Sequence, residues 1–122
     1  MRILMVEDKE DISSSMGMLF DIYGHDWIVR DNGHDAIESA LTFKPNLVLL
    51  DINIFGEMNG WDVCRKLRNQ SEFVETIICA ITGYGSPEDF NRSHQAGINK
   101  HFVKPVLLSD IVAFLLQNNI KF

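Results

Sequence analysis

The sequence lacks several features that mark common functional classes, beginning with thiol and metal-thiolate sites. Its 122 residues include only two cysteines, Cys64 and Cys79. Both lie in apolar surroundings, without a C-x-x-C spacing or a nearby histidine pair. This pattern argues against a zinc site and favours two small buried hydrophobic side chains in a reducing compartment.

A basic excess is also missing. The chain carries 11 Lys and Arg against 17 Asp and Glu, so its formal net charge is -6. A nucleic-acid binder needs a basic face to displace counterions from the phosphates. We therefore expect no direct contact with nucleic acid.

Long apolar runs are absent as well. The first run covers residues 3–6 and is followed at once by Glu7 and Asp8. A run this short predicts neither a signal peptide nor a membrane span, and a cytoplasmic location is the default expectation. There is no internal repeat, low-complexity segment or linker, so residues 1–122 are expected to form one domain.

The most informative stretch that is present covers residues 47–53, with the sequence LVLLDIN. Four apolar residues in a row are typical of a strand buried on both faces, and the strand would deliver Asp51 at its carboxyl end. An Asp after a strand is by itself more often a turn or capping residue. The other strand ends must therefore decide its role.

Strand and helix patterns alternate along the whole chain. Strands are expected at residues 3–6, 26–30, 47–51, 77–81 and 101–103. Helices are expected at residues 10–23, around 36–41, at 60–68, from Ser86 to about Gln95, and at 107–117. The alternation predicts an α/β fold with a doubly wound, five-stranded parallel sheet flanked by five helices. The strand order 2-1-3-4-5 would leave the more polar second strand at an edge.

Carboxylates follow two neighbouring strands of this predicted sheet. Glu7 and Asp8 follow the first strand, and Asp51 ends the third. Two carboxylates in close contact repel by roughly 4 kcal/mol at an effective dielectric constant near 20, so the group must bind protons or a cation. Carboxylates with one backbone carbonyl, here that of Asn53, are the ligands that Mg²⁺ prefers. The sequence therefore predicts a magnesium site.

The remaining strand ends add a hydroxyl and a cation. Thr82 ends the fourth strand, and Lys104 follows the fifth. Together with Mg²⁺, these groups can hold a phosphoryl group, while Asp51 supplies the nucleophile. The product would be an aspartyl phosphate.

These elements resemble the receiver domain of two-component response regulators, in order and over essentially the whole chain. The matching motifs are Glu7-Asp8, the run ending in Asp51 with Asn53, Thr82-Gly83, and Lys104-Pro105. The resemblance implies that Asp51 accepts a phosphoryl group from a sensor histidine kinase or a histidine phosphotransfer protein.

The resemblance also implies roles for the surrounding residues. Glu7, Asp8, Asp51 and the Asn53 carbonyl would bind Mg²⁺, while Thr82 and Lys104 would contact the phosphoryl oxygens. The family's switch position, three residues before the lysine, falls on His101. Such a protein is a phosphorelay signalling switch that assists its own phosphorylation and slow dephosphorylation, rather than an enzyme. Its downstream partner is not indicated.

Two departures from the family pattern concern the loop and the switch position. Receivers usually carry Pro four residues after the phosphoacceptor, where this chain has Phe55, and the loop to Gly60 is one residue longer, with Glu57 as the extra residue. The switch residue is most often Tyr or Phe. His101 can fill the same steric role with a titratable ring, or it is a solvated surface histidine.

Two other functions remain open. Haloacid-dehalogenase phosphatases also use an Asp nucleophile with Mg²⁺, but they require an acid/base Asp two positions later, where this chain has Asn53. An amide cannot shuttle a proton, which disfavours a hydrolase. A degenerate receiver that only binds partners is the second alternative, and the altered loop keeps it open.

The last helix carries more apolar residues than one buried stripe uses. Val112, Phe114 and Leu116 either contribute to a partner face or homodimer face with the fourth helix, or pack under the C-terminal tail. Trp61, Val63 and Leu67 are expected in the core. His25, His34 and His94 show no metal-ligand spacing.

Overall fold

The computed structural model describes residues 1–54, 56–83 and 85–122. Its centre is a five-stranded parallel sheet in the order β2-β1-β3-β4-β5, as the sequence predicts. The strands are β1 (Arg2–Val6), β2 (Asp26–Arg30), β3 (Leu47–Asp51), β4 (Ile77–Thr82) and β5 (Lys100–Val103). The strand with the most polar ends, β2, lies at an edge, where one side needs no strand partner.

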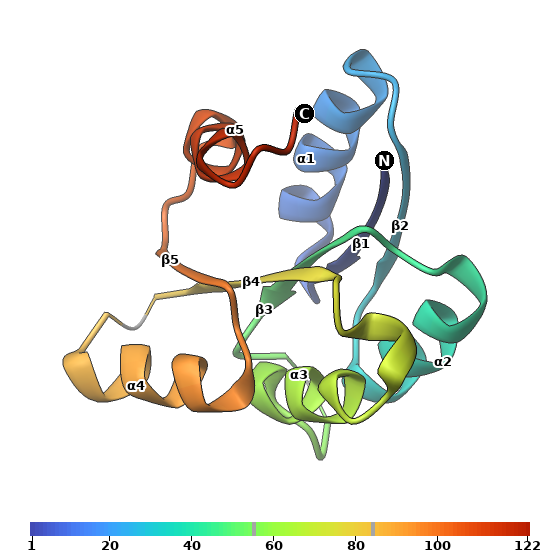
Figure 1. Ribbon diagram of the computed structural model, residues 1–122. Coiled ribbons are helices and arrows are strands. Elements are labelled where there is room, and N and C mark those ends of the chain that lie inside the picture. The colour runs from blue at the N-terminus through green and yellow to red at the C-terminus, as the bar shows by residue number, and fades with distance from the viewer. Residues whose placement is uncertain (55, 84) are drawn as a thin grey trace.

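Helices cover both faces of the sheet. Helices α1 (Glu10–Ile22) and α5 (Leu108–Gln117) pack on one face, and α2 (Gly33–Phe43), α3 (Gly60–Arg68) and α4 (Pro87–Ala96) pack on the other (Figure 1). This arrangement confirms the doubly wound α/β fold. A short 3-10 helix, η1 (Ser71–Phe73), follows α3 and was not expected from the sequence.

The two faces of β3 explain its uninterrupted apolar run. Successive side chains of a strand point to opposite faces. Val48 and Leu50 join the core beneath α2, α3 and α4, together with Val63 and Leu67. The intervening leucines of β3 join the core under α1 and α5, which includes Phe20 and Ile111. All five residues of β3 are buried, so its single carboxylate is carried on a rigid, desolvated support.

The helix boundaries follow local sequence signals. Ser86 caps α4 and accepts a hydrogen bond from the Asp89 backbone N–H, while Pro87 occupies the first helical position. A second capping box, between Asn59 and Asp62, starts α3. Gly97 ends α4 with φ +96°, a left-handed conformation that glycine adopts without strain. These signals place both helices beside the carboxyl ends of β3 and β4.

Helix α3 begins directly against the end of β3, and a glycine allows this contact. A Cβ atom on Gly60 would lie 2.7 Å from the Asp51 carbonyl oxygen and 2.7 Å from Ile52 Cα. The backbone N–H of Gly60 donates to the Ile52 carbonyl at 2.9 Å. Close packing of α3 therefore fixes the backbone on which Asp51 stands.

The Lys104–Pro105 peptide bond is cis. Among the helices in the described part of the chain, none combines the length and the apolar character required to cross a membrane.

Candidate functional site

The carboxyl ends of β1 and β3 bring three acidic side chains together. Asp51 is the last residue of β3 and is 3% exposed, and Glu7, directly after β1, is 6% exposed. Asp8 is partly exposed. Each of the three offers a carboxylate oxygen, and these oxygens lie within 4.8 Å of one another. Residues far apart in the sequence therefore form one compact set of hard oxygen ligands.

Lys104 places a cation against this acidic cluster. Its Nζ atom lies 3.1 Å from Asp51 Oδ2 and 3.9 Å from Glu7 Oε1. The backbone N–H of Lys104 donates to the Thr82 carbonyl at 2.7 Å, which ties the start of the loop after β5 to the end of β4. The lysine is thus aimed at the two buried carboxylates by the strand ends themselves.

The pKa of the Glu7 carboxyl group is shifted strongly by its surroundings. Burial, the hydrogen bond to Asp51 and the Asp51 charge raise the pKa of Glu7 to about 7, although the Lys104 charge opposes them. The carboxyl of Glu7 is therefore partly protonated at neutral pH in the metal-free protein. A divalent cation would favour the ionised form, because it supplies the positive charge that the buried oxygens lack.

Asn53 lies beside the cluster through its backbone. Its N–H donates to Asp51 Oδ1 at 3.0 Å, which orients the carboxylate, while the residue itself is exposed. The proposed ligand is its carbonyl oxygen. In the loop that follows, Gly56 adopts φ +108° and Glu57 is exposed. Phe55, at the position where receivers usually carry Pro, lies outside the described residues.

The donor set fits a small hard cation. Two buried carboxylates, one partly exposed carboxylate and a nearby backbone carbonyl match the oxygen ligands of Mg²⁺. Among the described residues, a second group of potential ligands is formed by His34, Asp35 and Glu38 on α2. All three are exposed. That group has no buried charge to compensate, so the cluster at the strand ends is the better candidate.

Thr82 lies on the next strand tip. Asp51 pairs with Ile81 across β3 and β4, so Thr82 stands one residue further out along β4. Its side chain is fully buried. The structure therefore holds this hydroxyl residue on a rigid strand beside Asp51.

His101 is buried and lies apart from the carboxylates, on the side of the sheet that α4 covers. It is 9% exposed, which overturns the alternative of a solvated surface histidine. Its Nδ1 atom lies 2.7 Å from Ser93 Oγ, and its ring centroid lies 4.2 Å from that of Phe90. No local pattern in the sequence indicated the contact with Ser93.

The three apolar residues singled out on α5 differ in their surroundings. Phe114 packs on the core, with its ring centroid 6.2 Å from that of Phe102. Val112 is partly buried, whereas Leu116 is 58% exposed. The partner or dimer face assigned to these residues stays a prediction. Trp61, Val63 and Leu67 are buried, as expected.

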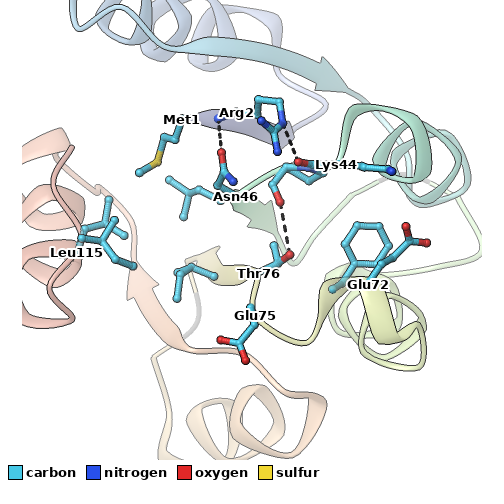
Figure 2. Close-up of a pocket in the computed structure, with 13 residues that line it drawn as sticks. Met1, Arg2, Lys44, Asn46, Glu72, Glu75, Thr76 and Leu115 are labelled. Carbon is cyan, nitrogen blue, oxygen red and sulfur yellow. Dashed lines mark hydrogen bonds between the residues drawn. The ribbon is translucent and has the colours of Figure 1, made fainter.

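Hollows in the surface lie at both ends of the strands. One of about 570 Å³ borders Asp51 and Lys104 and extends between α1 and the connection from β5 to α5. Another of about 550 Å³ lies at the amino ends of the strands (Figure 2). There Arg2 Nε donates to the Lys44 carbonyl at 2.9 Å, and Asn46 accepts from the Arg2 backbone. These contacts hold neighbouring segments of the chain together. The clustered carboxylates and Lys104 lie at the carboxyl ends, which are therefore the better candidate for the functional site.

Comparisons with known proteins identify relatives of this chain by sequence and by fold. Residues 3–116 match the response regulator receiver domain family. The chain is 30% identical over 110 residues to sporulation initiation phosphotransferase F of Bacillus subtilis, covering 90% of this chain and 86% of that protein.

Solved structures show the same fold. The BeF3-activated N-terminal receiver domain of Klebsiella pneumoniae RstA superposes with a TM-score of 0.85 at 27% identity, over 96% of this chain and 97% of that one. The receiver domain of sensor histidine kinase PA1611 from Pseudomonas aeruginosa gives a TM-score of 0.83 at 23% identity, over 95% and 94%. That structure holds a magnesium ion in its active-site cleft.

Proposed function

The chain belongs to the response regulator receiver domain family of two-component and phosphorelay signalling, and from this premise we propose that it is a switch driven by phosphorylation of Asp51. The observation that carries the proposal is the contact of Lys104 Nζ with Asp51 Oδ2 at 3.1 Å, inside a cluster of buried carboxylates. A cation fixed against a buried carboxylate is the arrangement that phosphoryl transfer needs, because catalysis there is mostly positioning and charge neutralisation.

The proposed reaction uses the chain's own carboxylate as the nucleophile. An oxygen of Asp51 forms a bond to phosphorus while the phosphorus–nitrogen bond of a phosphohistidine donor breaks, and the imidazole departs with the electron pair. The Asn53 N–H holds Asp51 Oδ1 at 3.0 Å and leaves Oδ2 facing Lys104. The buried support of β3 keeps that oxygen in place.

Magnesium is the proposed cofactor, held by Glu7, Asp8, Asp51 and the Asn53 carbonyl. When bound, it would neutralise charge on the phosphoryl oxygens. The three clustered carboxylates at the strand ends and the magnesium in the PA1611 receiver support this assignment. Lys104 and Thr82 would contact the remaining oxygens.

The energetic requirement explains why more than one contact is needed. Moving a two-state equilibrium from about 1:99 to 99:1 takes roughly 5.5 kcal/mol of differential binding. One hydrogen bond to a charged group contributes about 1.5–3 kcal/mol. Thr82 and Lys104 together come close to this requirement, with His101 as the residue that carries the change onward.

The phosphoryl donor is proposed to be a sensor histidine kinase or a histidine phosphotransfer protein. Residues 1–122 would act as one receiver domain, as a phosphoacceptor with slow self-dephosphorylation rather than as an enzyme with a separate substrate. The presence of Asn53, and not Asp, two positions after Asp51 supports a lasting aspartyl phosphate over rapid hydrolysis, because an amide cannot act as the acid/base group.

Intact mass spectrometry tests the proposal directly. After incubation with acetyl phosphate and Mg²⁺, the parent chain should gain the mass of one phosphoryl group, and Asp51→Asn should gain none. Phosphate released continuously without accumulation of the phosphoprotein would favour a hydrolase. No uptake by the parent would favour a receiver that only binds partners.

A further inference from the structure

A buried chain of three polar groups connects α3, α4 and β5, away from the carboxylate cluster. Trp61 Nε1 donates to Ser93 Oγ at 2.8 Å, and Ser93 Oγ lies 2.7 Å from His101 Nδ1. Trp61, Ser93 and His101 are 7%, 2% and 9% exposed. Water has little access to any of these groups, so their hydrogens must be placed within the protein.

The chemistry of tryptophan fixes the direction of this chain. An indole N–H can only donate, so Ser93 Oγ must be the acceptor from Trp61. Trp61 and His101 are the side-chain partners of the Ser93 hydroxyl among the described residues. The hydroxyl hydrogen therefore points to His101 Nδ1, because leaving it unpaired in this buried place would be costly. The Nδ1 atom of His101 is then the acceptor, and the ring hydrogen lies on Nε2.

The same contacts attach α4 to its neighbours. Ser93 and Phe90 both belong to α4, and both touch the His101 ring, the second at 4.2 Å between centroids. The guanidinium of Arg92 lies 5.5 Å from the centroid of the Trp61 ring. A displacement of the His101 ring would break the bond to Ser93 and the ring contact, unless α4 moved with it.

We propose that Ser93 is a positioning residue of the switch. Its hydroxyl, held by Trp61, fixes the orientation and tautomer of His101 and joins β5 to α4, so that movement of His101 on phosphorylation is transmitted to α4. The coupling rests on the function proposed for Asp51. The hydrogen-bond chain itself is a property of the resting protein and can be tested without phosphorylation.

The first test is the state of the His101 ring. Nitrogen NMR of the resting protein at neutral pH should show the hydrogen on Nε2 and an unprotonated Nδ1. In Ser93→Ala this preference should be weakened or lost. A hydrogen on Nδ1 of His101 in the parent protein, whether the ring is neutral or charged, would contradict the proposed direction of the Ser93–His101 hydrogen bond.

A double-mutant cycle gives a second, independent measurement. His101→Phe keeps an aromatic ring but leaves the Ser93 hydroxyl without an acceptor, so it should lower the urea midpoint. The same substitution combined with Ser93→Ala should cost less, because the unpaired hydroxyl is gone. An equal loss in both backgrounds would contradict the predicted bond.

The third measurement tests transmission to α4. The Trp61 indole N–H resonance should shift when beryllium fluoride and Mg²⁺ are added to the parent, and this shift should be lost in Ser93→Ala. The control Ser14→Ala, an exposed serine on α1, should respond like the parent. Phosphoryl uptake from acetyl phosphate should be equal in the parent, Ser93→Ala and Ser14→Ala.

The outcomes separate the two proposals. A parent-like shift in Ser93→Ala overturns the coupling even when phosphorylation is normal. A parent that takes up no phosphoryl group overturns the proposed function and the coupling together, whereas the ring tautomer and the mutant cycle still decide the Trp61–Ser93–His101 chain.

Discussion

Lys104 and Asp51 are separated by 53 positions in the sequence, yet Lys104 Nζ lies 3.1 Å from Asp51 Oδ2. The contact arises because parallel strands deliver their carboxyl ends to one edge of the sheet. Lys104 also faces Glu7 at 3.9 Å, so a single cation is shared by two buried carboxylates. The electrostatic balance of the site depends on this lysine when no metal is bound.

Removing this cation should destabilise the metal-free protein. Lys104→Met leaves Asp51 and Glu7 without a positive partner, and we expect a loss of about 1–3 kcal/mol in the free energy of unfolding. Saturating Mg²⁺ should restore part of the loss. Urea unfolding with and without Mg²⁺ measures both effects. Lys66→Met, at an exposed lysine on α3, is the matched control and should change little; equal losses in the two variants would contradict the account.

Glu7 should make the stability of the metal-free protein depend on pH. Its pKa is raised from 4.5 to about 7 in the folded protein, so the folded state binds the extra proton between these values. The contribution is fully present below pH 4.5 and is lost as pH rises through 7, with a change on the order of 3 kcal/mol. Urea midpoints of parent and Glu7→Gln across pH 5–8 provide the measurement.

Comparison with Glu7→Gln shows whether the stability contributed by Glu7 rises or falls with pH. Glu7→Gln keeps the size of the side chain and cannot ionise, so the difference in stability between variant and parent should grow in favour of the variant as pH rises. A difference that stays constant over this range would show that Glu7 does not titrate near neutrality.

Thr82 should matter more for the response than for phosphorylation. Thr82→Ala removes a buried hydroxyl but leaves Asp51 and its acidic neighbours in place. We expect phosphoryl uptake close to that of the parent and a weaker conformational response, because about 1.5–3 kcal/mol of differential binding is lost. Amide hydrogen exchange of α4, with and without beryllium fluoride, measures the response. Thr82→Ser retains the hydroxyl and should recover it; parent-like changes in Thr82→Ala would refute the role.

Gly60 should be required for the geometry of the site. Gly60→Ala would place a Cβ atom 2.7 Å from the Asp51 carbonyl oxygen and from Ile52 Cα, so α3 must shift away from β3. We expect a loss of roughly 1–3 kcal/mol in stability and slower phosphorylation. Gly83→Ala is the control, because none of the described residues other than its chain neighbours has an atom within 4 Å of the added Cβ. Similar stability of the two variants would disprove the close-packing argument.

The fold and the acidic cluster could be predicted from sequence for one physical reason. Glu7, Asp8, Asp51 and Lys104 each follow an apolar run, and the ends of parallel strands converge. Phe114 shows the limit of such patterns, since its position on the last helix did not reveal the ring contact with Phe102. Its part in a partner face stays a prediction.

Contacts between helices were beyond the reach of the sequence. The pattern of α4 is polar, and nothing local distinguishes Ser93, which is buried, from exposed serines. Arg68 is a similar case. Its guanidinium donates to the carbonyls of Gly97, Phe73 and Thr76 and to Asn99 Oδ1, and these acceptors are set by the tertiary structure. The burial of His101 likewise follows from the packing of α4, which the sequence pattern does not reveal.

The central claim is that Asp51 is the residue phosphorylated, and mapping the acyl phosphate tests it most directly. The chain would be incubated with acetyl phosphate and Mg²⁺, reduced with borohydride to convert an aspartyl phosphate into homoserine, digested, and sequenced by mass spectrometry. The account predicts homoserine at position 51 and a large decrease in its yield when Mg²⁺ is chelated. Homoserine at another acidic position, or equal labelling of Asp51→Asn, would contradict it.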